Sequence, residues 1–204
     1  MDGWNKFNNI ALWMIKLAYL NILWLGFSLI GILFFGLFPA TAAMFTVVRK
    51  WMNGEKYVRI FHTFWGVFRK EFFILNGFSL LFFGVGYFLY YDLLFLQLNS
   101  GKLQFLYPVI IFILIAYIIT LLFFFPVYVH FELKFFQYMK QSFLIAITSP
   151  FEIIQMVIAI VILYFIVTLL PGIIPLFTGS LLAVAMTWLS MRAFAKVERR
   201  KGIR

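Results

Sequence analysis

The side chains that could do chemistry in this sequence are few and widely separated. His62 and His130 lie far apart, and His62 has no acidic companion at the spacing of a helical metal site. The chain has no Walker loop for nucleotide phosphates and no cysteine. Four charged groups stand near the ends of apolar runs, where headgroup contact explains them better than a proton relay: Lys16, Asp92, Glu132 and Glu152. We therefore predict no enzyme activity, catalytic residue, metal site or cofactor.

Amides and prolines inside the apolar runs are the next candidates. Asn21 and Asn76 lie at membrane depth, where an amide bonds to a neighbouring helix or lines a polar path. Both roles stay open for Asn76. Pro39 and Pro126 each lie near the end of an apolar run, where a proline kinks a helix as a packing feature or a hinge.

The richest surface chemistry lies in "KYVRIFHTFWGVFRKEFF", Lys56 to Phe73. The residues His62, Arg69 and Lys70 recur on one face of a helix, with aromatic residues on the opposite face, including Phe61, Phe64, Trp65, Phe68 and Phe72. This pattern predicts an amphipathic helix lying in the membrane interface, with its aromatic face among acyl chains. Two roles are open for this segment: an interfacial anchor, which the pattern alone favours, and a docking surface for a partner.

The composition determines which elements carry these residues. The chain is 65% hydrophobic and 12% charged over 204 residues, whereas soluble domains carry about a quarter charged residues. Apolar runs predict five transmembrane helices in one all-α domain, residues 1–204: 14–38, 73–95, 105–129, 152–170 and 174–193. The first charge-free run, Leu17 to Val48, is too long for one span and must tilt, kink at Pro39 or extend beyond the bilayer. "LLPGIIPLF" separates the last two spans.

The basic residues predict the orientation of these spans. Of 17 lysines and arginines, 14 fall in the loop before residue 73, the loop after residue 129 and the C-terminal tail. Because basic loops stay cytoplasmic, we predict a multi-pass plasma-membrane protein with its N-terminus outside and its C-terminus in the cytoplasm. The net charge of +10 is then a topology signal, and no nucleic-acid partner is expected.

A weak internal repeat relates the two halves of the chain, 14–95 and 105–193. "FPATAAMFTVVRKW", Phe38 to Trp51, aligns with "FPVYVHFELKFFQY", Phe125 to Tyr138. A second amphipathic segment, "LKFFQYMKQSFLIAI", follows the second copy, with Phe136, Met139, Phe143 and Ile147 on its apolar face. Copies separated by two spans have the same orientation, so this would be a parallel repeat.

Residues 20–78 carry a resemblance to a known family. "LNILWLGFSLIGILFFGLFPATAAMFTVVRKWMNGE" followed by "IFHTFWGVFRKEFFILNGF" resembles the YesL family of small integral membrane proteins of Gram-positive bacteria. The matching pattern includes Pro39 with Ala40, the step from Arg49 to Trp51, the aromatic segment 61–72, and Asn76 with Gly77. The resemblance implies no established activity, a bacterial plasma membrane, and association with carbohydrate uptake systems that include sugar ABC importers.

Two functional hypotheses follow. The first is a non-enzymatic membrane accessory protein that binds a partner such as sugar ABC importer subunits through its cytoplasmic amphipathic segments. The second is a small oligomeric channel or facilitator with a path near Asn76, in which case the chain would be a homo-oligomer. Polar side chains are scarce at membrane depth, which favours the first hypothesis, because a pathway for sugars should offer several hydrogen-bonding groups there.

Overall fold

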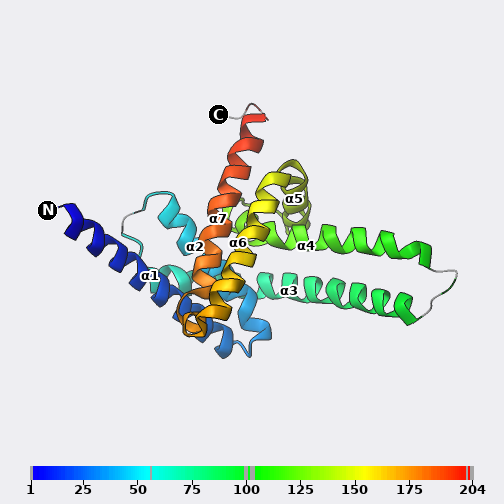
Figure 1. Ribbon diagram of the computed structural model, residues 1–204, viewed down its shortest axis with the longest axis horizontal. Helices are drawn as coiled ribbons and strands as arrows, with labels where there is room; N and C mark the ends of the chain where they lie inside the picture. The colour runs from blue at the N-terminus through cyan, green and yellow to red at the C-terminus, as the bar shows by residue number, and fades with distance from the viewer. Residues whose placement is uncertain (1, 56, 99–100, 102–103, 201, 203–204) are drawn as a thin grey trace.

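The computed structural model describes residues 2–55, 57–98, 101, 104–200 and 202. The described residues form helices and turns without a strand (Figure 1). The α-helices are α1 (Asp2–Ile30), α2 (Phe34–Met52), α3 (Ile60–Leu98), α4 (Tyr107–His130), α5 (Phe135–Thr148), α6 (Pro150–Leu169) and α7 (Ile174–Arg200). Four residues used in the charge analysis lie outside the described residues: Lys56, Lys102, Lys201 and Arg204.

Within the described residues, five helices are long and apolar enough to cross a bilayer. They are Phe7–Ile30, Ile60–Leu98, Gln104–His130, Pro150–Leu169 and Pro171–Arg199. The predicted all-α polytopic membrane protein is thereby confirmed. The predicted break between the last two spans is also present, because α6 ends at Leu169 and a short 3₁₀ turn, Pro171–Ile173, leads into α7.

The first predicted span, 14–38, needs correction, because α1 ends at Ile30 and the chain reverses direction. The Trp24 indole N–H donates to Thr41 Oγ1 at 3.0 Å, and the rings of Trp13 and Trp51 lie 5.5 Å apart. These pairs show that α1 and α2 form an antiparallel hairpin. The start of α1 and the basic loop after α2 therefore lie at the same end of the molecule, whereas a single span would have put them on opposite sides.

The hairpin closes at Gly31–Leu33, well before Pro39. Ile32 and Leu33 both have a φ of 56°, and a Cβ atom on Gly31 would lie 2.3 Å from the Gly36 Cα. The close approach of the two backbones needs glycine at this position. The turn contains no charged residue and no proline that would have predicted it from the sequence. Helix α2 continues through Pro39 and carries a large share of the hydrophobic core, including the fully buried small residues Ala40, Ala43 and Val47.

The segment predicted to lie along the interface is instead the N-terminal part of α3. The 39-residue helix runs from Ile60 to Leu98 with no proline inside it, so the charged residues at 69–71 do not end it. Its aromatic face packs on α1, where the Phe27 ring lies 5.0–6.4 Å from four rings: Phe61, Phe64, Trp65 and Phe68. Protein, rather than lipid alone, covers this face.

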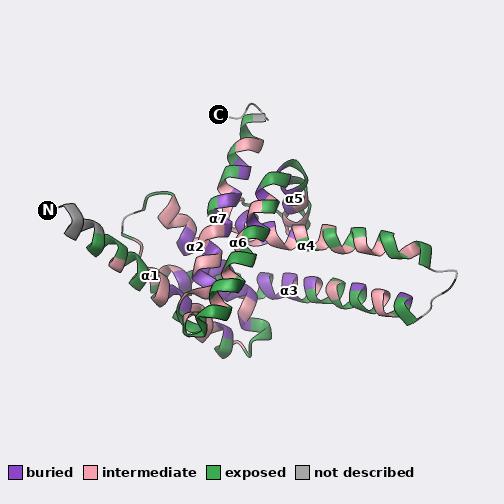
Figure 2. Cartoon of the chain, viewed as in Figure 1, coloured by how far each residue is buried: buried purple, intermediate pink, exposed green. Residues whose placement is uncertain are grey.

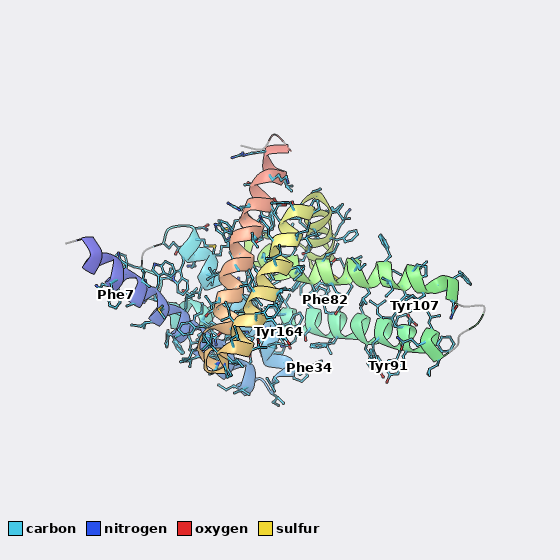
Figure 3. The ribbon with its side chains drawn as sticks, viewed as in Figure 1. Phe7, Phe34, Phe82, Tyr91, Tyr107 and Tyr164 are labelled. Carbon is cyan, nitrogen blue, oxygen red and sulfur yellow. The ribbon has the colours of Figure 1, made fainter. Side chains whose placement is uncertain are left out.

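Helices α3 and α4 form a second hairpin, whose far end projects from the rest of the molecule (Figure 1). Tyr117 of α4 donates its hydroxyl to the Phe82 carbonyl at 3.0 Å near the base of this hairpin. Tyr91 and Tyr107 lie toward its closing end (Figure 3). The projecting part is largely exposed, as a lipid-facing surface should be (Figure 2).

Asn21 connects the first hairpin to the last helix. Its amide nitrogen donates to the Pro175 carbonyl at 2.8 Å, and its amide oxygen accepts the Ser180 backbone N–H at 3.0 Å. Asn21 is fully buried and bonds to a neighbouring helix, the packing role expected of an amide at membrane depth. Helix α6 packs beside α7, where Lys196 lies 3.7 Å from Glu152.

The second predicted amphipathic segment forms α5, but with a different buried face. Ser142, Ile145 and Ala146 are its buried residues, whereas Phe136 and Ile147, which the pattern placed on its apolar face, are exposed. Small residues are buried because they allow α5 to approach its neighbours closely.

The two Phe-Pro steps of the proposed repeat meet in the core. The rings of Phe38 and Phe125 lie 5.2 Å apart, and α2 runs in the same direction as α4. The two copies differ after the proline. Helix α4 ends at His130, four residues after Pro126, whereas α2 continues to Met52, thirteen residues after Pro39. The repeat stays a prediction.

Candidate functional site

A polar pocket opens where α2 and α4 end, beside the first half of α3. The cavity has a volume of about 580 Å³. Because α2 and α4 run in the same direction, their C-terminal turns bring distant polar residues together. The polar side chains that line the pocket are Thr46, Arg49, Lys70, Glu71, Tyr128, His130, Glu132 and Tyr138.

Arg49 joins the ends of the two helices. One terminal guanidinium nitrogen donates to the Val129 carbonyl in the last turn of α4. The last carbonyls of a helix lack partners within it, and a cation at that end also complements the helix dipole. A guanidinium remains charged at neutral pH. The Nε of Arg49 is buried and has no hydrogen-bond partner in the described part of the chain.

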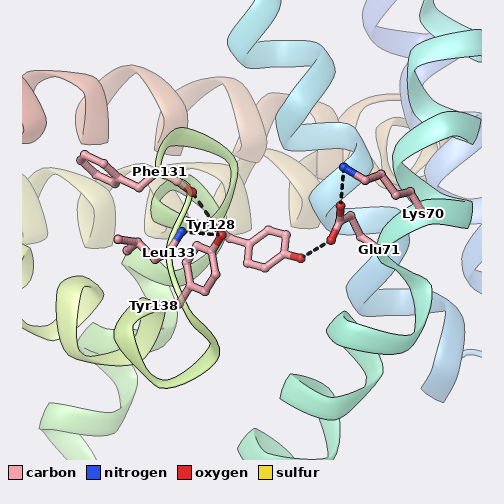
Figure 4. A network of polar contacts seen from close by, with 6 residues as sticks. All are labelled: Lys70, Glu71, Tyr128, Phe131, Leu133 and Tyr138. Atoms are coloured by element: carbon pink, nitrogen blue, oxygen red, sulfur yellow. Dashed lines mark hydrogen bonds and ion pairs between the residues drawn. The ribbon is translucent and has the colours of Figure 1, made fainter.

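A hydrogen-bonded network forms the opposite wall of the pocket (Figure 4). Tyr128 of α4 donates its hydroxyl to Glu71 Oε2 at 2.7 Å, and Lys70 Nζ lies 3.5 Å from Glu71 Oε1. Tyr138 donates to the Phe131 carbonyl at 3.2 Å and accepts the Leu133 backbone N–H at 3.1 Å. The Tyr128–Glu71 hydrogen bond connects α4 to α3, the Lys70–Glu71 ion pair lies within α3, and the Tyr138 contacts fix the link between α4 and α5.

His130 completes the wall near Arg49. Its ring lies 4.6 Å from the ring of Phe194 on α7 and 4.7 Å from that of Phe131. Like Arg49 Nε, His130 Nδ1 is buried without a hydrogen-bond partner among the described residues. A guanidinium N–H and an imidazole nitrogen that line one cavity are suited to an anionic group with several acceptor oxygens.

Comparison with known proteins places this architecture in a family. Residues 17–93 match the family described as "Protein of unknown function, DUF624". "Uncharacterized protein YesL" of Bacillus subtilis (strain 168) is 34% identical over 198 residues, which cover 97% of this chain and 93% of that protein. "Uncharacterized protein YteU" of the same organism is 34% identical over 190 residues, covering 93% and 86%. The chain belongs to the DUF624 family. No solved structure matches it.

The DUF624 match covers α1 from residue 17 onward, α2 and most of α3, and thus part of the pocket lining. Arg49, Lys70 and Glu71 fall inside the matched residues, whereas Tyr128 and His130 fall outside them. The YesL resemblance noted in residues 20–78 is confirmed, and the similarity to YesL extends over nearly the whole chain. Neither the family description nor the names of these relatives assign an activity.

Some of the residues predicted as functional in the segment 56–73 are buried or in contact with α1, and the others are exposed. Phe68 is buried in the core, while Phe61 and Trp65 are about half exposed and contact Phe27. His62, Arg69 and Lys70 are exposed, and we refer to these three side chains as the cationic face of α3. Of the three, Lys70 also lines the polar pocket.

The other predicted residues lie inside the protein. Asn76 is buried, and its amide nitrogen donates to the Phe72 carbonyl of its own helix at 2.8 Å, while its Oδ1 has no partner among the described residues. Pro39 and Pro126 are buried within continuous helices. The part played by these three residues in packing or motion stays a prediction.

Sequence reasoning missed the pocket because its residues come from separate helices. Arg49 counted toward membrane orientation and the family resemblance, Glu71 was not singled out within "FRKEFF", and His130 was set aside for its distance from His62. Tyr128 and Glu71 are 57 residues apart, and no local spacing reveals that pair. The aligned Phe-Pro steps were no guide either, because that alignment pairs Arg49 with Phe136 of α5 and not with the C-terminal end of α4.

Proposed function

We propose that this DUF624 protein is a non-enzymatic integral membrane protein that docks a cytoplasmic partner through the cationic face of α3. The observation that carries the proposal is the packing of the opposite, aromatic face on Phe27 of α1. Phe64 is 0% exposed and Phe68 is 7% exposed, so these two rings are not available to insert among acyl chains. A purely interfacial anchor would need them there.

The charge distribution on α3 supports docking. The side chain of Lys70 is 83% exposed, and His62 and Arg69 are also exposed on the same helix. Clustered cations of this kind attract an acidic surface, steer its approach and set its orientation. Membrane-embedded helices contact lipid elsewhere, above all along the projecting α3–α4 hairpin.

The proposed partner is a subunit of a sugar ABC importer. Support for its identity comes from the YesL resemblance alone, and no side chain of the chain selects it. The alternative, a small oligomeric channel or facilitator, receives less support, because Asn76 bonds within its own helix. A cavity beside α3 also has mainly apolar walls, including Trp24, Phe38 and Phe82.

Co-purification after crosslinking in native membranes tests the docking proposal. Charge reversal by Arg69→Glu with Lys70→Glu should abolish partner recovery while leaving abundance and membrane insertion intact, because neither side chain is in the core. The matched control is Arg192→Glu with Arg199→Glu on α7, which changes the net charge equally and should retain the partner. Unchanged recovery from a well-expressed α3 variant would contradict the proposal.

The hairpin leads to a revised membrane orientation, with both termini in the cytoplasm. Because Trp13 lies against Trp51, the start of α1 shares an end with the basic loop after α2. Helix α2 then acts as a further crossing segment, and 16 of the 17 basic residues lie on the cytoplasmic side, with Lys102 alone outside. This distribution obeys the positive-inside rule better than an external N-terminus does.

Reporter fusions check the orientation. Fusions at the N-terminus, at Gly54 and at the C-terminus should all report cytoplasm, and a fusion in the loop that contains Gly101 should report the exterior, because positive charge retains the first three on the inner side. A fusion that reports an external N-terminus together with a cytoplasmic Gly54 would contradict the hairpin.

A further inference from the structure

Arg49 and His130 line the polar pocket and each has a buried nitrogen without a partner among the described residues, and we propose that the pocket binds a phosphate ester. The phosphate would accept hydrogen bonds from the guanidinium of Arg49 and from the imidazole of His130. Both a lipid headgroup and a soluble phosphorylated metabolite offer this chemistry. The inference goes beyond partner docking, because it concerns a cavity and a ligand rather than the outer face of α3.

Arg49 has no ion-pair partner among the described residues. Among the described residues, the ion pairs are those of Lys50 with Glu55, Lys70 with Glu71, and Lys196 with Glu152, so none involves Arg49. One terminal nitrogen of its guanidinium donates to the Val129 carbonyl, while Nε is buried without an acceptor among the described residues. A charged donor held without an acceptor is costly, and an anionic oxygen would remove that cost.

The opposite wall limits where a negative charge can lie. The Glu71 carboxylate is already held by Tyr128 and Lys70, and Glu132 adds a second carboxylate to the lining. An anionic group is therefore favoured next to Arg49 and His130 and disfavoured next to the carboxylates. A hydroxyl-bearing substituent suits the latter, because carboxylates accept hydrogen bonds from hydroxyl groups.

The size and the location of the cavity both fit an ester. A cavity of about 580 Å³ lies within the usual range of small-molecule sites and exceeds what a bare phosphate would fill. The cavity lies at the C-terminal ends of α2 and α4. Because α4 is one of the candidate membrane spans, its end lies at the level where headgroup phosphates gather.

The test uses the full-length protein, delipidated in detergent, with two probes. Glycerol 3-phosphate represents a soluble ester, and phosphatidylglycerol represents a headgroup, with diacylglycerol as its phosphate-free counterpart. Native mass spectrometry and the shift in melting temperature report binding. We expect one of the two phosphate probes to bind and diacylglycerol not to. Binding of glycerol 3-phosphate would identify a soluble ligand, whereas binding of phosphatidylglycerol alone would identify a lipid headgroup.

Variants locate the binding. Arg49→Gln and His130→Gln should each weaken it by about ten-fold or more, as expected for the loss of a charged or buried hydrogen bond. Lys50→Gln removes the neighbouring positive charge, which pairs with Glu55 outside the pocket, and should bind like the parent protein. If Arg49→Gln fails to fold, His130→Gln decides. Failure of both phosphate probes to bind, or equal binding by His130→Gln, would overturn the inference without affecting partner docking.

Discussion

Replacing Gly36 with alanine should prevent the α1–α2 hairpin from closing. A Cβ atom at this position would lie 2.6 Å from the carbonyl oxygens of both Phe27 and Ser28, well inside contact distance. All three of its nearest atoms belong to the backbone of α1, so no side-chain rotation relieves the clash. We expect a loss of about 3 kcal/mol or more in unfolding free energy, at the upper end of overpacking costs. Denaturation of the purified protein in mixed micelles measures this loss.

Gly26→Ala is the matched control for this prediction. Gly26 lies on α1 in the same hairpin, but a Cβ atom there would meet no atom within 4 Å. Because alanine is a better helix former than glycine, this variant should be neutral or more stable by up to about 1 kcal/mol. Equal stability of the Gly36 and Gly26 variants would show that the two helices do not approach closely at Gly36.

The same hairpin shows where sequence reasoning succeeded and where it failed. The spans α4, α6 and α7 follow from charge-free runs that end at loops or at proline, and those signals are local. The turn after α1 lies in the middle of the charge-free run from Leu17 to Val48 and contains no proline. Hydropathy cannot detect a reversal between two apolar helices, because both sides of the turn are equally apolar.

The prediction for the segment that forms α3 failed for the opposite reason. Arg69, Lys70 and Glu71 indicated the end of a span, yet charged side chains at one end of a helix do not stop its backbone hydrogen bonding. The decisive interaction is the contact of its aromatic face with Phe27, more than thirty residues earlier in the chain. The amphipathic pattern showed that one face would be covered, but it could not distinguish protein from lipid as the cover.

The polar pocket needed tertiary structure for the same reason. Arg49, Glu71 and His130 come from three helices, and each has an ordinary local explanation: orientation, a surface charge, or an isolated histidine. Only the parallel course of α2 and α4 brings their C-terminal turns together. Any chemistry that depends on two distant residues is invisible to spacing within one segment.

Phe64→Ala should be strongly destabilising, because Phe64 is a buried core residue of α3 that contacts Phe27 of α1. Its side chain is 0% exposed, and its ring lies 5.3 Å from that of Phe27. Truncation of a buried phenylalanine leaves a cavity and costs about 3–5 kcal/mol in soluble proteins. We expect about 2–4 kcal/mol here, because lipid competes less strongly than water for apolar surface and the loss is mainly one of van der Waals packing.

Phe73→Ala provides the comparison that separates a core residue from a lipid contact. Phe73 lies on the same helix, removes the same atoms when truncated, and is 86% exposed. Its loss should change the unfolding free energy by no more than about 0.5 kcal/mol, as for surface substitutions in general. If the aromatic face of α3 were instead an anchor in the acyl chains, lipid would fill the space of the Phe64 ring, and its truncation would create no cavity. The two variants would then have similar stabilities, and Phe64→Ala would weaken membrane contact without loosening α1 from α3.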